Sequence, residues 1–121
     1  MTATPRQNLG KWGEALAADY LSQRGYTLLE RNARTSYGEL DLVMRQGGGT
    51  VFVEVKTRAT PAYGLPEESI TPRKQEHLLN AARAYLQTHA ELGGDWRVDV
   101  IAIRRMRGGP PEVVHFENVL H

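Results

Sequence analysis

The fold is decided by two short segments that lie on either side of a run of glycines. They read GELDLVMR at residues 38–45 and TVFVEVKTR at residues 50–58, with three glycines at 47–49 between them. Segments rich in β-branched residues and joined by a short glycine-containing loop are typical of a β-hairpin. We therefore expect strands over 39–45 and 50–58, paired antiparallel.

The hairpin carries charged side chains within apolar strands. Successive side chains of a strand alternate between its two faces, which places Glu54 and Lys56 on one face. A hairpin loop of residues 46–49 would set Asp41 opposite Glu54 on that same face. A loop of 47–49 alone would shift the pairing by one residue and turn Asp41 away. Proximity of the two carboxylates therefore depends on the register.

Two interpretations of these charges are open. Carboxylates directly opposite each other repel, and a divalent cation between Asp41 and Glu54 would convert that repulsion into coordination. With oxygen ligands alone, Mg²⁺ or Mn²⁺ is favoured over zinc. Alternatively, Glu54 and Lys56 form a partly solvated ion pair on an edge strand, worth about 0 to 1 kcal/mol, while Asp41 caps a turn.

Composition narrows the class of protein. The chain has 121 residues, which favours a single domain over 1–121, and a formal net charge of +1, so nucleic-acid binding would rest on local clusters of basic residues. It contains no cysteine, which excludes disulfides, a thiol nucleophile and cysteine-ligated metals. Apolar runs are too short for a membrane span or a signal peptide. We expect a cytoplasmic protein with no membrane partner.

The remaining elements follow from periodicity and capping residues. A helix is expected over 8–24, capped by Asn8, with Leu9, Trp12, Leu16 and Tyr20 as its apolar face. A second helix is expected from Thr71 and Pro72 to about residue 89, after a loop at 59–70. The other expected segments are strands at 26–30, 96–103 and 113–119 and a polar connection at 31–38. The order α-β-β-β-α-β-β implies an α/β fold, a three-layer-like sandwich with a mixed sheet of about five strands flanked by helices.

Further motifs accompany the hairpin: GKWGE at 10–14, PRKQ at 72–75, RVDV at 97–100 and HFEN at 115–118. Together these residues, from about Leu9 onwards, resemble the YraN-like family of small bacterial proteins. That resemblance implies a restriction-endonuclease-like fold similar to archaeal Holliday-junction resolvases. It also implies a PD-(D/E)xK-type motif on Asp41, Glu54 and Lys56. Leu40 stands where the wider superfamily often has proline.

The resemblance implies a role for each of these residues. Asp41 and Glu54 would hold Mg²⁺ or Mn²⁺, and Lys56 would orient or deprotonate the attacking water. Glu14 would complete the metal site, with a solvated helix glutamate as the alternative. We expect Glu39 to face away from Asp41 unless the strand begins later, with a structural hydrogen-bond acceptor as its alternative role.

Basic residues near the motif suggest contacts with phosphate. Arg58 shares the strand face of Lys56. Arg73 and Lys74 lie in the first turn of the second helix, where free backbone amides also favour phosphate. We expect these three residues to bind a nucleic-acid backbone, and Gln75 matches a superfamily position near the scissile phosphate. Solvated surface charge and an ordinary polar helix residue are the alternatives.

The leading functional hypothesis is a metal-dependent DNA endonuclease acting on branched, recombination or repair intermediates, with the substrate taken from family analogy. Cutting two strands of a junction would favour a symmetric homodimer. One alternative is a non-catalytic nucleic-acid-binding module of the same fold. A protein-interaction domain that uses a sheet edge is another. The intact trio of Asp41, Glu54 and Lys56 argues against the non-catalytic module.

Overall fold

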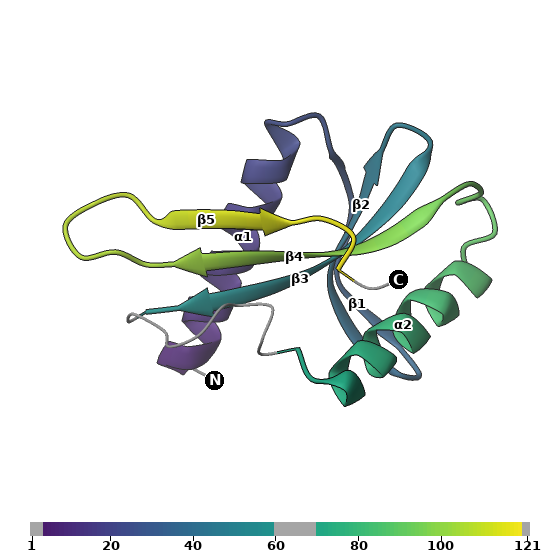
Figure 1. The fold of residues 1–121 in the computed structure, drawn as a ribbon, viewed down its shortest axis with the longest axis horizontal. Coiled ribbons are helices and arrows are strands. Elements are labelled where there is room, and N and C mark those ends of the chain that lie inside the picture. Colours follow the sequence, from purple (N-terminus) through teal and green to yellow (C-terminus); the bar gives the residue numbers. More distant parts are fainter. Residues whose placement is uncertain (1–3, 60–69, 120–121) are drawn as a thin grey trace.

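The chain forms a five-stranded mixed sheet with one helix on each face (Figure 1). The computed structural model describes residues 4–59 and 70–119, so most of the loop expected at 59–70 lies outside the described residues. The elements are α1 Pro5–Ser22, β1 Thr27–Thr35, β2 Gly38–Gln46, β3 Gly49–Arg58, α2 Pro72–Gln87, β4 Trp96–Arg104 and β5 Glu112–Phe116. The expected α/β fold class and element order are confirmed. Within these ranges, no helix is long and apolar enough to cross a bilayer.

The sheet has the strand order β1-β2-β3-β4-β5. Strands β3 and β4 are parallel and are connected through α2, whereas the other neighbours are antiparallel. Because β3 is the central strand, Glu54 and Lys56 do not lie on a sheet edge. The edge-strand placement of the alternative interpretation is therefore wrong, although the Glu54–Lys56 ion pair itself is present at 3.5 Å.

Alternating side chains of the sheet supply two separate hydrophobic cores. The core under α2 contains Val43, Phe52, Val98 and Val100 from the sheet with Leu78, Ala82 and Tyr85 from the helix. The core under α1 contains Leu42, Val51, Val53 and Ile101 from the sheet with Ala17 and Leu21 from the helix. Both faces of the sheet are covered, as mixed sheets with a parallel pair require.

Helix α1 starts earlier than expected. It begins at Pro5, and Thr4 caps it in a reciprocal capping box with Gln7, so the assignment of Asn8 as the cap is wrong. Its fully buried residues are Gly13, Ala17, Ala18 and Leu21, while the large apolar residues of the expected face pack only partly buried beside them. Small residues bring the helix axis close to the sheet, and the large ones then fill its flanks.

Strand β1 is longer than the expected strand at 26–30. It continues to Thr35 with a register irregularity between Leu28 and Glu30, so the polar connection expected at 31–38 is wrong. Within β1 only Ala33 is buried. An edge strand needs few apolar residues because much of its surface faces water, and this polar segment therefore gave no strand signal.

Gly13 allows α1 to approach β3. A Cβ at this position would lie 2.0 Å from Thr57 Oγ1, whereas a Cβ at Gly10 on the same helix would meet nothing within 4 Å. We predict that Gly13→Ala lowers the free energy of unfolding by about 1 to 3 kcal/mol through overpacking. Gly10→Ala is the matched control and should stabilise the helix by up to about 1 kcal/mol. Urea denaturation of both variants measures this, and equal midpoints would contradict the close approach.

Candidate active site

The β2–β3 hairpin has the register that the carboxylate hypothesis requires. Arg45 pairs with Thr50 and Leu42 pairs with Val53, in the pairing expected for a loop of 46–49. Gln46 also pairs with Gly49, so the turn itself is tighter than expected. This register carries Asp41 towards the position opposite Glu54.

The two strands part at Asp41. The Leu42–Val53 pair is the last of the ladder, and beyond it Asp41 Oδ2 accepts a hydrogen bond of 2.8 Å from the backbone N–H of Val55. A carboxylate thus takes the place of a strand carbonyl. Leu40 and Val43 both lie in the core under α2, which shows that side-chain alternation is interrupted between them. The parting strands leave room beside Glu54.

Glu54 is held between two ammonium groups. Its side chain is largely buried, and Oε1 lies 3.5 Å from Lys56 Nζ and 3.2 Å from Lys74 Nζ. Lys56 comes from the same strand, whereas Lys74 reaches across from the first turn of α2. Because α2 connects β3 to β4, the crossover brings this first turn over the open end of β3. We expected Lys74 to bind the phosphate backbone of a nucleic acid. In the structure, its ammonium group contacts the carboxylate of Glu54.

The surroundings of Asp41, Lys56 and Lys74 shift the pKa of each group. Burial, together with the nearby charge of Glu54, raises the pKa of Asp41 to about 7. Burial and the neighbouring Lys74 lower the pKa of Lys56. Burial alone would lower the pKa of Lys74, but its contacts with Lys56 and Glu54 raise it overall. The pKa values of the two lysines are thus shifted in opposite directions.

A cavity of about 320 Å³ opens above these groups. Its lining includes Asp41 and Glu54, Glu39 from β2, and Lys74 and His77 from α2. Glu39 shares the cavity with Asp41, so the expectation that it faces away is wrong. Side chains two residues apart on a strand share a face, so a common cavity for Glu39 and Asp41 is what strand geometry favours.

Asn32 connects the outlying carboxylates and was missed by the sequence analysis. Its Nδ2 donates to Glu14 Oε1 at 3.0 Å and to Glu39 Oε1 at 3.1 Å. Asn32 lies within β1 at φ +53°, a left-handed conformation that asparagine tolerates better than most residues. The charges of Glu14 and Glu39 both raise the pKa of Asp41, although less than its burial and Glu54 do. Only this tolerance of left-handed backbone could have singled out Asn32 in the sequence.

The donor set fits a hard divalent cation. Within the described residues, the contacts found for Asp41 and Glu54 use Oδ2 and Oε1, which leaves one oxygen of each carboxylate for a metal ion in the expected site. In the same part of the chain, no three histidine or carboxylate side chains form a ready-made metal cluster. Mg²⁺ commonly takes only one or two carboxylates and completes its shell with water and phosphate. Participation of Glu14 stays a prediction.

The other residues expected to bind nucleic acid lie around the site. Arg58 is exposed at the end of β3, and Arg73 is exposed in the first turn of α2. Gln75 Nε2 donates to the carbonyl of Ile70 at 3.2 Å, which fastens the segment before α2. Of the four, only Lys74 contacts the carboxylates.

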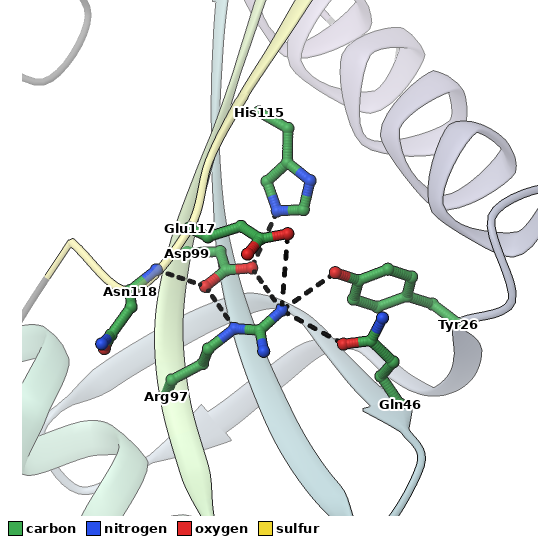
Figure 2. Close-up of polar contacts among 7 residues, drawn as sticks. All are labelled: Tyr26, Gln46, Arg97, Asp99, His115, Glu117 and Asn118. Atoms are coloured by element: carbon green, nitrogen blue, oxygen red, sulfur yellow. Dashed lines mark hydrogen bonds and ion pairs between the residues drawn. The ribbon is translucent and has the colours of Figure 1, made fainter.

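A second polar cluster lies on the α1 side of the sheet and centres on Asp99 (Figure 2). Asp99 is fully buried, and it accepts hydrogen bonds from Arg97 Nε at 2.9 Å and from the backbone N–H of Asn118 at 2.8 Å. His115 Nε2 lies 2.7 Å from its other oxygen. Arg97 also donates to the Tyr26 hydroxyl at 2.9 Å.

This cluster fastens the C-terminal segment to the sheet. It joins β4, β5 and the segment before β1, and it explains the RVDV and HFEN motifs as parts of the fold. Strand β5 ends at Phe116, before the expected residue 119, because Asn118 turns to φ +51° and donates to Asp99. Burial opposes ionisation, but the hydrogen bonds from His115 and Arg97 lower the pKa of Asp99 overall.

We predict that Asp99→Asn lowers the free energy of unfolding at pH 7 by about 3 kcal/mol, because it leaves Arg97 without its buried partner. A lowered folded pKa gives stability above the unfolded pKa of about 3.9 that is lost as pH falls. The difference in the free energy of unfolding between Asp99→Asn and wild type should therefore become smaller below pH 4. Glu117→Gln, whose carboxylate is exposed and 4.0 Å from Arg97, is the control and should change little. A pH-independent difference in chemical denaturation would contradict this assignment.

For Asp41 we predict the opposite dependence of stability on pH, measured in chelator-treated protein. With its pKa raised to about 7, the folded state binds a proton that the unfolded chain releases. Stability should therefore fall as pH rises from about 4 to above 7. Asp41→Asn should remove this slope and be more stable at pH 8 by about 1 to 2 kcal/mol. Thermal melts across pH test this, with exposed Asp19→Asn as the control, and parallel curves for Asp41→Asn and wild type would count against it.

Comparisons with known proteins place the chain in a family. Residues 13–103 match the model of the uncharacterised protein family UPF0102. A UPF0102 protein of Clavibacter michiganensis is 48% identical over 91% of this chain and 93% of its own length. Those of Syntrophomonas wolfei and Geobacter sulfurreducens are 46% and 44% identical, over 93% and 91% of this chain and 96% and 86% of their own lengths.

Among solved structures, that of Pyrococcus furiosus SfsA in complex with Ca²⁺ aligns with a TM-score of 0.43 and 15% sequence identity. The alignment covers 96% of this chain, which spans 65% of that chain. The family match and the relatives confirm the resemblance seen in the sequence motifs. The chain belongs to the uncharacterised protein family UPF0102, the YraN-like family.

Proposed function

We propose that this chain is a Mg²⁺- or Mn²⁺-dependent nuclease that hydrolyses phosphodiester bonds in DNA. The observation that carries the proposal is the convergence of Asp41, Glu54 and Lys74 on one cavity from three elements, with Lys56 Nζ 3.5 Å from Glu54 Oε1. Two largely buried carboxylates beside two lysines are costly for a fold to maintain. Titratable groups with perturbed pKa values in a cleft are typical of catalytic sites.

The residues divide the work of hydrolysis. Asp41 and Glu54 would hold the cation, which when bound acidifies water and neutralises charge on the phosphate. Lys56, whose pKa is lowered by burial and by Lys74, is suited to orient the attacking water and to accept its proton. Lys74 keeps its charge more firmly and is placed to hold a phosphate oxygen. No covalent enzyme intermediate is needed.

The choice of DNA, and of branched or repair intermediates, rests on the family resemblance and on the surrounding cations. Arg58 and Arg73 are exposed on either side of the loop that links β3 to α2. Such residues suit sequence-independent contacts with a phosphate backbone. A homodimer that cuts both strands of a junction remains part of this proposal.

A cleavage assay with matched variants tests the proposal. Wild type should bind Mn²⁺ in calorimetric titration and cut DNA from a panel of linear, flapped and four-way substrates. Glu54→Gln should lose both metal binding and cleavage. Lys56→Ala removes a proton acceptor but no metal ligand, so it should still bind Mn²⁺ while cleavage falls by about 10² or more. Glu76→Gln on the exposed side of α2 is the control and should behave as wild type.

Three outcomes would contradict a nuclease. Wild type that binds no Mn²⁺, combined with a Glu54→Gln variant that melts far lower, would make Glu54 a purely structural ion-pair partner. Binding of DNA without cleavage under any metal would identify a non-catalytic nucleic-acid-binding module. Neither metal nor DNA binding would favour a protein-interaction domain.

A further inference from the structure

Tyr37 is presented to solvent by a tightly tied turn. It lies with Ser36 between β1 and β2, and its side chain is 52% exposed. The Thr35 hydroxyl accepts from the Tyr37 N–H at 3.1 Å and donates to the Gly38 carbonyl at 2.7 Å. Gly38 closes the turn at φ +123°, a conformation that side chains rarely allow. The backbone that carries the ring is therefore held in place.

The ring stands at the edge of the candidate active site. Tyr37 lines the same cavity as Asp41, Glu54 and Lys74, and His77 lines it from α2. The cavity is thus lined by an aromatic residue from the β1–β2 turn, by carboxylates from β2 and β3, and by a lysine and a histidine from α2. Its volume of about 320 Å³ is within the range of small-ligand pockets.

Tyr37 differs from the other large apolar side chains that are exposed. Within the described residues these are Leu28, Leu29, Met106 and Val114, which are all aliphatic and do not line this cavity. Scattered aliphatic exposure is ordinary on a protein surface. An exposed aromatic ring beside the proposed nuclease site suits a nucleobase, because every nucleobase has a flat face that can stack on such a ring.

We propose that Tyr37 stacks on an unpaired base of the strand whose phosphate lies at Asp41 and Glu54, an inference that rests on the proposed function. In a continuous duplex each base face is covered by its neighbours, so only an unpaired, flapped or frayed nucleotide can offer one to a side chain. Tyr37 therefore selects substrates with single-stranded or opened segments over fully paired DNA. It acts as a specificity-determining residue and takes no part in proton transfer.

Cleavage kinetics on two matched DNA substrates, one flapped and one fully duplex, test this selection. Wild type, Tyr37→Ala and Tyr37→Phe are compared in Mn²⁺ on a flapped DNA and on a linear duplex of the same sequence. Tyr37→Ala should lower kcat/KM for the flapped DNA by about tenfold or more, the size expected for a lost stacking contact. The duplex rate should stay unchanged, and Tyr37→Phe should keep the preference. Met106→Ala, an exposed side chain beyond β4 towards the other edge of the sheet, is the control.

A binding measurement separates this inference from the nuclease proposal. A flapped DNA carrying the fluorescent base 2-aminopurine in its unpaired arm should be quenched by wild type and Tyr37→Phe but not by Tyr37→Ala. Quenching without cleavage would support the stacking role and contradict the nuclease. Cleavage with equal flap preference and equal quenching in wild type and Tyr37→Ala would overturn the stacking role and leave the nuclease standing. Absence of DNA binding by wild type would contradict both.

Discussion

The hydrogen bond from the Val55 N–H to Asp41 is the constraint on which the rest of the site depends. It lets β2 leave β3 while the exposed strand amide remains satisfied, since a buried N–H without a partner would be costly. The parting strands open the space beside Glu54, and the first turn of α2 closes over it. Asp41, Glu54 and Lys74 thereby line one cavity between the sheet and α2.

Charge balance explains how the fold tolerates this opening. Asp41 and Glu54 are acidic and largely buried, but Glu54 has two lysines within ion-pair distance and Asp41 has a strongly raised pKa. Each group is therefore either paired or able to take up a proton. In the proposed nuclease, a bound cation would take the place of these internal compensations.

The two faces of the sheet serve different purposes. The face under α2 carries the carboxylates, the lysines and the cavity, whereas the face under α1 carries the fully satisfied cluster around Asp99. Both include motifs that mark the family. Asp99 and His115 are residue types that often serve in catalysis. Here they contact each other, and Asp99 also accepts from the Asn118 N–H, so the pair holds β5 and the segment after it against β4. The sequence motifs of this chain thus include residues of the candidate site and residues of its scaffold.

Local chemistry allowed the sequence alone to predict the hairpin, the start of α2 at Thr71 and Pro72, and the element order. It left two hairpin registers open, and the structure has the one that brings Asp41 towards Glu54. These features depend on turn length, capping and alternation over a few residues. The contact of Lys74 with Glu54 and the bonds from the left-handed Asn32 to Glu14 and Glu39 were decided by tertiary structure. They arise where strands part and where a crossover helix packs, and such long-range geometry leaves no periodic trace in the sequence.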